Sequence, residues 1–113
     1  MISVLVIENE EEKILPLHKA LSTFDNLNIV LTNGIDLAKE ANSKQYFDFV
    51  FLDSSLEQEK SIKCIKNIKS YNPLTMIIVL ANEHSQDEEH QFLSIGVKDF
   101  LKKSIHTELL VQR

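Results

Sequence analysis

Residues 47–56 read FDFVFLDSSL. Apart from Asp48, the stretch from Phe47 to Leu52 is continuously apolar. An apolar run without alternation is typical of a strand that is buried on both faces, as in a parallel sheet covered by helices. The run stops at Asp53, which two serines follow. The stretch therefore predicts a buried strand that presents a carboxylate at its carboxyl end.

Four further short runs have the same character, being rich in Val, Ile and Phe. They are Ile2–Ile7, Ile29–Leu31, Met76–Ala81 and Val97–Leu101. The segments between the runs carry apolar residues at intervals of three and four, which is the spacing of one helix face. Alternating strands and helices predict an α/β domain of five strand–helix units, in which right-handed crossovers give a parallel sheet with helices on both faces.

The first helical segment contains Pro16. Because a proline inside a helix costs about 3 kcal/mol, we expect this helix to begin near Glu12, so that Pro16 lies in its first turn. The last helix, Thr107–Arg113, is short, which is compatible with an excerpt from a longer chain. Three more helices are predicted between the first and the last from apolar residues at helical spacing, which are Leu37, Ala38 and Ala41; Ile62, Ile65 and Ile68; Phe92 and Ile95.

The composition and charge limit the classes of protein to which this chain can belong. The 113 residues fit one domain, and 43% of them are hydrophobic. The net charge of −5 argues against nucleic-acid binding by this domain, because such binding needs a basic patch. A single cysteine, Cys64, excludes an intrachain disulfide and fits a reducing compartment. No signal peptide is recognisable and no apolar run approaches the ~20 residues of a membrane span, so we expect a cytoplasmic domain.

Glycine is scarce, with Gly34 and Gly96 the only two in the chain. A phosphate-binding P-loop needs two glycines close together, and a dinucleotide-binding fingerprint needs three. Neither motif can be present, so we do not expect this chain to bind a nucleotide through a P-loop or a dinucleotide-binding fingerprint.

Polar residues gather where the predicted strands end. The first strand ends in Glu8-Asn9, the third in Asp53-Ser54-Ser55, the fourth in Ala81-Asn82 and the fifth in Lys102-Lys103. Ligands of open parallel sheets bind outside the carboxyl ends of the strands. We therefore expect carboxylates from two strands and a lysine from a third to converge on one rim.

At this point the sequence resembles a known family. The segments VLVIENEEE (4–12), FDFVFLDSSL (47–56), IIVLANE (77–83) and GVKDFLKKSI (96–105) are similar, in order and separation, to those of response-regulator receiver domains. The resemblance extends over essentially all of residues 1–113. It implies a flavodoxin-like three-layer α/β fold with a five-stranded parallel sheet in the order 2-1-3-4-5.

The resemblance also implies a role for individual residues. Asp53 occupies the position of the phosphate-accepting aspartate, and Lys103 that of the lysine beside it. Glu8 and Asn9 stand where the family usually has two acids that hold Mg²⁺, with Ser55 offering a backbone carbonyl to the same ion. Phe100 fills the position of the aromatic switch residue.

The sequence departs from the family pattern at four places. Asn9 replaces an acid, which should weaken Mg²⁺ binding because Mg²⁺ prefers carboxylate oxygens. Ala81 stands where a Ser or Thr normally binds the phosphoryl group and moves the neighbouring loop. Ser104 replaces a proline that often follows a cis bond, and because cis costs ~3–4 kcal/mol before other residues, we expect trans. The segment Glu57–Ser61, expected to be a loop, lacks the usual glycine-rich turn.

Three hypotheses follow. The first is a receiver domain that takes a phosphoryl group on Asp53 from a histidine kinase or phosphotransfer protein. It would signal through the face of the fourth helix, fifth strand and fifth helix to a homodimer partner or an effector domain. The second is a pseudo-receiver, which binds partners irrespective of phosphorylation. The third, a small flavodoxin-like oxidoreductase, is disfavoured because Glu8–Glu12 would repel a flavin phosphate. Neither of the first two is an enzyme beyond self-catalysed phosphoryl acceptance and loss.

Overall fold

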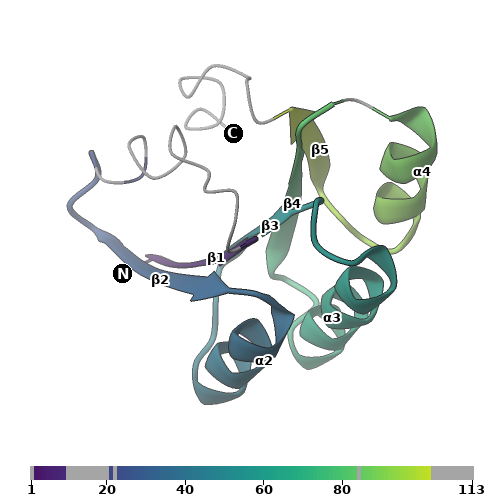
Figure 1. The fold of residues 1–113 in the computed structure, drawn as a ribbon. Helices are drawn as coiled ribbons and strands as arrows, with labels where there is room; N and C mark the ends of the chain where they lie inside the picture. The colour runs from purple at the N-terminus through teal and green to yellow at the C-terminus, as the bar shows by residue number, and fades with distance from the viewer. Residues whose placement is uncertain (1, 10–20, 22, 84, 103–113) are drawn as a thin grey trace.

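The computed structural model describes residues 2–9, 21, 23–83 and 85–102 (Figure 1). From the second strand onward, strands and helices alternate along this part of the chain. In chain order the elements are β1 (Ile2–Glu8), β2 (Leu27–Asn33), α2 (Ile35–Lys44), β3 (Phe49–Asp53), α3 (Gln58–Tyr71), β4 (Met76–Ala81), α4 (Gln86–Ser94) and β5 (Asp99–Lys102). All five predicted strands are therefore present, with their ends shifted by no more than two residues.

The five strands form one sheet in the order β2-β1-β3-β4-β5, and every neighbouring pair is parallel. This is the order that the family resemblance implied. β1 and β3 are adjacent, with Ile7 opposite Leu52. Since all strands run the same way, their carboxyl ends share one edge of the sheet, where Glu8 and Asp53 are the last strand residues.

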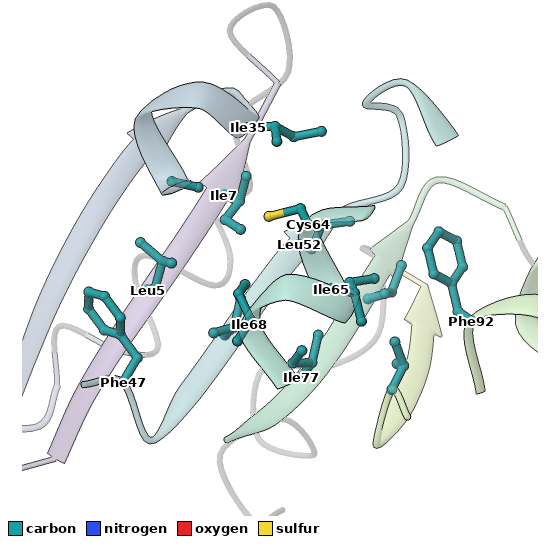
Figure 2. Close-up of a cluster of buried hydrophobic side chains, with 14 of the residues drawn as sticks. Leu5, Ile7, Ile35, Phe47, Leu52, Cys64, Ile65, Ile68, Ile77 and Phe92 are labelled. Atoms are coloured by element: carbon teal, nitrogen blue, oxygen red, sulfur yellow. The ribbon is translucent and has the colours of Figure 1, made fainter. Parts of the chain in front are cut away.

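Alternation along each strand divides the apolar side chains between the two faces of the sheet. One face packs against α2, α3 and α4, which Figure 1 shows on the same side. The helix-side cluster there consists mainly of Leu5, Ile7, Val50, Leu52, Ile77, Val79, Ile35, Ala38, Cys64, Ile65, Ile68, Phe92 and Phe100 (Figure 2). On the other face Val4, Val6, Phe51, Ile78, Leu80 and Leu101 are buried with Leu21. The helices expected from Glu12 and over Thr107–Arg113 lie outside the described residues.

One prediction about the helices is wrong. The segment Glu57–Ser61 is not a loop, because α3 begins at Gln58, with Glu57 as the preceding cap residue. Gln, Glu and Lys are favourable in helices, and no glycine interrupts them. Ser61 is buried, and its hydroxyl donates a 2.8 Å hydrogen bond to the carbonyl of Glu57. The turn after β3 is therefore short, which keeps α3 close to Asp53.

Local signals explain where the other helices begin. Ser85 caps α4, its hydroxyl accepting a 3.3 Å hydrogen bond from the backbone N–H of Glu88. α2 follows Gly34, whose φ of 97° is accessible to glycine and strained for other residues. In α2 the buried face consists of Ile35 and Ala38, whereas Leu37 is 51% exposed although its spacing suggested a core position.

Candidate functional site

Glu8 and Asp53 lie next to each other at the carboxyl edge of the sheet. The β1–β3 register ends with Ile7 opposite Leu52, so the two acids are one step further along adjacent strands. Both are buried, with exposed fractions of 3% for Glu8 and 0% for Asp53. Charged groups are rarely buried unless they are paired or hold a cation. The structure thus brings together the two carboxylates that the sequence selected.

The turn after β3 fixes the carboxylate of Asp53. The backbone N–H of Ser55 donates a 2.9 Å hydrogen bond to Oδ1 of Asp53, and the N–H of Leu56 donates to its carbonyl at 3.2 Å. The N–H of Ser54 donates to the carbonyl of Leu80 in β4 at 2.9 Å. An aspartate that accepts a bond from two residues ahead forms an Asx-turn. These bonds hold the Asp53 side chain in one orientation and tie the turn to β4.

Asn9 connects the end of β1 to the same turn. Its Nδ2 donates a 3.1 Å hydrogen bond to the hydroxyl of Ser55, 46 positions along the chain. The carbonyl of the preceding residue, Glu8, accepts a 2.9 Å bond from the N–H of Gly34. Sequence reasoning gave Ser55 only a backbone role and missed its hydroxyl. No local pattern could have revealed this bond, because only the folded sheet places residues 9 and 55 together.

Ala81 is the last residue of β4, and it is 2% exposed. Its methyl group belongs to the helix-side cluster, where it packs with apolar side chains. Alanine has no hydrogen-bonding group in its side chain. The strand end next to Asp53 therefore contributes an apolar surface at the position where the resemblance implied a hydroxyl.

Phe100 lies in β5 and is 4% exposed. Its ring stacks on that of Phe92 from α4, with centroids 6.0 Å apart and planes inclined by 23°. The sequence marked Phe92 only as a residue of a helix face and did not connect it with Phe100. The two rings are eight positions apart in the chain, and their contact depends on how α4 crosses the end of the sheet.

The lysine predicted for the site, Lys103, and the neighbouring Ser104 lie outside the described residues, so their predicted roles stay predictions. Lys102, the last residue of β5, is exposed. Within the described residues no three His, Cys, Asp or Glu side chains form a metal-binding group.

Cys64 lies away from this edge, in α3, where it is fully buried in the helix-side cluster. Burial raises the pKa of its thiol from 9.0 to about 11, and the nearby positive charge of Lys39 opposes this rise. Because the thiolate is the reactive form, the thiol is inert at neutral pH. Cys64 is a packing residue of the helix-side cluster.

Asp53 is buried at the end of β3, beside an acid of β1, and its carboxylate accepts a hydrogen bond from the N–H of Ser55. These features define a class of α/β domain that has two acids at the switch point of its parallel sheet, where ligands of such folds bind. The family model of the response regulator receiver domain matches residues 4–113. The chain therefore belongs to the receiver domains of two-component signalling, which are signalling modules rather than enzymes. No curated protein sequence matches it.

Solved structures agree on the fold. A response regulator from Thermotoga maritima is 24% identical with a TM-score of 0.87, over 100% of this chain and 93% of that one. The beryllofluoride-activated NtrC4 receiver domain dimer is 22% identical with a TM-score of 0.84, over 99% and 92%. A response regulator from Burkholderia pseudomallei with a phosphorylated aspartic acid and a calcium ion is 21% identical, with a TM-score of 0.84. The match covers 98% of this chain but 65% of that protein.

None of the helices in the described part of the chain is both long and apolar enough to cross a bilayer.

Proposed function

We propose that Asp53 accepts a phosphoryl group from a phosphohistidine, on a histidine kinase or a histidine-phosphotransfer protein. The observation that carries the proposal is the placement of Asp53: a buried carboxylate at the end of an inner strand, beside Glu8 and held by the N–H of Ser55. In the transfer, a carboxylate oxygen of Asp53 forms a bond to phosphorus as the bond to the histidine nitrogen breaks. Phosphoryl transfer depends mostly on positioning and charge neutralisation, and the turn after β3 supplies positioning.

Charge neutralisation needs a cation, because nucleophile and donor are both anionic. Two like charges ~4 Å apart repel by about 4 kcal/mol at an effective dielectric near 20. The available ligands fit Mg²⁺: the carboxylates of Glu8 and Asp53, the amide oxygen of Asn9 and the backbone carbonyl of Ser55. When bound, the ion would offset the negative charge of the incoming phosphoryl group. Two carboxylates in place of three predict weak binding.

Lys103 is proposed as the second cation, on the family resemblance alone. A lysine that follows β5 starts from the same edge of the sheet as Asp53, because all strands are parallel. Its ammonium would pair first with the carboxylate and then with the phosphoryl group. The proposal for this residue is tested by Lys103→Ala, with Lys102→Ala as the neighbouring control.

Phosphorylation adds about −1.5 to −2 charges at Asp53, and the readout is proposed to pass to the face formed by α4, β5 and the segment after β5. Ala81 has no hydroxyl to follow the phosphoryl group, and Phe100 is stacked on Phe92. Both observations favour a small conformational response. The partner on this face would be a second receiver or an effector domain.

A pseudo-receiver remains the alternative function, and specific observations favour it. Asn9 turns its amide toward Ser55, and Ala81 is part of the apolar core. A domain with these features could bind its partner through a fixed surface. In that case partner binding would be the same with and without the Asp53 carboxylate.

Phosphorylation in vitro distinguishes a phosphate-accepting receiver from a pseudo-receiver. The chain is incubated with acetyl phosphate and Mg²⁺, and the intact mass and the amide NMR spectrum are recorded. Asp53→Asn should abolish the gain of one phosphoryl group. Asp48→Asn is a matched control, because Asp48 precedes the same strand. Its carboxylate accepts a 2.8 Å hydrogen bond from the backbone N–H of Ser3, near the amino ends of the strands and away from Asp53. A wild-type protein that gains no mass and shows no shift with beryllofluoride contradicts the proposal.

A further inference from the structure

The two outer strands of the sheet differ in how their edges are protected. β5 is only four residues long and has charged residues at both ends, Asp99 and Lys102. β2, at the opposite edge, has seven residues, LNIVLTN, with no charge, proline or glycine. Edge strands expose unpaired N–H and C=O groups, and proteins usually guard them with charges, prolines or short length. β2 has none of these protections.

Of the two exposed residues of β2, Leu31 and Asn33, the first is apolar. Leu31 is 54% exposed, and next to it lies a groove of about 330 Å³ between β2 and α2. Leu37 and Ala41 of α2 line this groove. An edge strand beside an apolar groove is the arrangement by which a sheet accepts an additional strand, since main-chain bonds give affinity and the groove takes a side chain.

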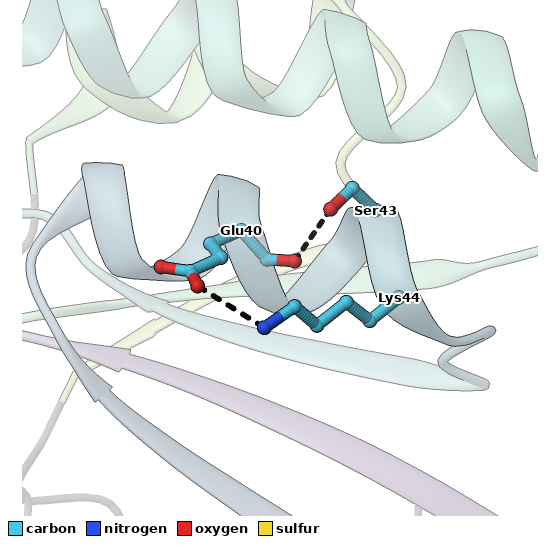
Figure 3. A network of polar contacts seen from close by, with 3 residues as sticks. All are labelled: Glu40, Ser43 and Lys44. Atoms are coloured by element: carbon cyan, nitrogen blue, oxygen red, sulfur yellow. Dashed lines mark hydrogen bonds and ion pairs between the residues drawn. The ribbon is translucent and has the colours of Figure 1, made fainter.

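The charges near this edge do not prevent two copies of the chain from meeting there. The chain has a net charge of −5, which opposes self-association in general. Along β2, however, there is no charge, and the α2 side of the groove carries one charge of each sign. Glu40 and Lys44 form a 3.1 Å ion pair there, beside the bond from Ser43 to the carbonyl of Glu40 (Figure 3).

The sequence of β2 complements itself when two copies run antiparallel. With a two-fold axis at Val30, Val30 faces its own copy, Leu31 faces Ile29, and Thr32 faces Asn28. Apolar thus meets apolar and polar meets polar, and the mixed pair Leu27–Asn33 falls at the strand ends. Moving the two-fold axis to Leu31 pairs the apolar Ile29 with the polar Asn33, and moving it to Ile29 pairs the polar Asn28 with the apolar Val30. A register that differs by one residue would instead pair side chains from opposite faces of the sheet.

We propose that the β2 edge binds a second copy of this chain, joining two five-stranded sheets into one continuous sheet about a two-fold axis at Val30. An antiparallel pairing closes as an isologous dimer, since each strand is its own partner. This interface lies at the opposite edge of the sheet from β5. It needs neither phosphate nor metal, so it is independent of the proposed phosphoryl acceptance.

The first test is sedimentation of the chain without phosphodonor, beryllofluoride or Mg²⁺. A concentration-dependent dimer is expected, and Leu31→Lys should weaken it by about tenfold or more, because a lysine on an edge opposes strand pairing. Leu74→Lys is the matched control: Leu74 is 80% exposed and lies in the turn before β4, an inner strand. A wild-type protein that stays monomeric up to millimolar concentration, or a dimer that Leu31→Lys leaves intact, overturns the proposal.

The second test examines the register. In the proposed dimer Val30→Cys places two thiols opposite each other, so mild oxidation should link the copies. Asn33→Cys, whose partner is Leu27, should not cross-link under the same conditions. Native Cys64 does not interfere, because it is buried with a raised pKa of about 11. Equal cross-linking of both variants would overturn the two-fold axis at Val30.

Discussion

Asn9 and Ser55, from the ends of β1 and β3, are joined by a 3.1 Å hydrogen bond between the side-chain amide and the hydroxyl. The backbone N–H of the same serine donates to Oδ1 of Asp53. The asparagine therefore braces the turn that holds the proposed phosphate acceptor. It does so at the position where the family resemblance implied an acid for a metal ion.

Asn9→Asp should convert this brace into a metal ligand. A third carboxylate is expected to raise the affinity for Mg²⁺ by about tenfold or more, because Mg²⁺ prefers carboxylate oxygens. Without Mg²⁺ the variant loses an amide donor, and the free energy of unfolding should fall by about 0.5–1.5 kcal/mol. Mg²⁺ titration by calorimetry and urea unfolding measure the two effects.

The matched control for this substitution is Asn28→Asp. Asn28 also donates from Nδ2 to a serine hydroxyl, that of Ser3, at 3.3 Å and at the far end of β1. It should alter Mg²⁺ affinity by less than about twofold, because its distance from Glu8 and Asp53 exceeds a screening length of ~8 Å. Equal affinities of Asn9→Asp and wild type would argue against a metal site at Glu8 and Asp53.

Ala81→Ser should restore part of a conformational response. A hydroxyl that bonds a charged phosphoryl group is worth about 1.5–3 kcal/mol, which is comparable with typical allosteric coupling energies. Beryllofluoride should then shift the amide signals of α4 and β5 more than it does in the wild type. Ala38→Ser, another buried alanine but in α2, should leave the wild-type shifts unchanged. Shifts of equal size in all three proteins would exclude this role of position 81.

The stacked rings of Phe92 and Phe100 should contribute strongly to stability. Phe92 is 1% exposed, and Phe92→Ala is expected to cost about 3–5 kcal/mol through lost burial and a cavity. Phe92→Leu keeps most of the burial and should lose the ring stacking, which is worth about 0.5–1.5 kcal/mol, together with a smaller packing loss. Urea unfolding gives both values.

Phe24→Ala is the surface control for these variants, because Phe24 is 44% exposed. It should change stability by clearly less than Phe92→Ala. A Phe92→Ala protein as stable as Phe24→Ala would contradict the packing of α4 on β5.

Cys64 should make stability decrease in alkaline solution. Its thiol has a pKa of 9.0 when exposed and about 11 in the folded protein, so the unfolded chain loses this proton at lower pH than the folded one. The stabilisation is complete below pH 9 and is lost as the pH rises toward 11. At most it amounts to about 3 kcal/mol, at ~1.4 kcal/mol per pKa unit.

The comparison that isolates this contribution is wild type against Cys64→Ala, unfolded in urea at pH 8 and at pH 10.5. The two proteins share every other side chain, so the difference between their pH dependences reports on the thiol. The wild type should lose more stability over this range than the variant. Parallel pH dependences would contradict the raised pKa.

Much of the fold was encoded locally and could be predicted from the sequence. Five apolar runs set the strands, and the parallel order followed once four segments resembled receiver domains. Asp53, Glu8 and Ala81 were placed at strand ends because a strand end can be located from where an apolar run stops, whereas their roles came from the family resemblance. The extent of α3 was misjudged at Glu57–Ser61, where the absence of glycine was interpreted as an altered loop although the residues there favour a helix.

What the sequence alone determined is the burial of the inner strands on both faces and the identity of the residues at their carboxyl ends, because both depend on neighbours along the chain. Only the tertiary structure decided that Asn9 bonds the hydroxyl of Ser55 and that Phe92 stacks on Phe100. These contacts join segments whose approach depends on how the strands are ordered and how the helices cross them, and no local pattern specifies that geometry.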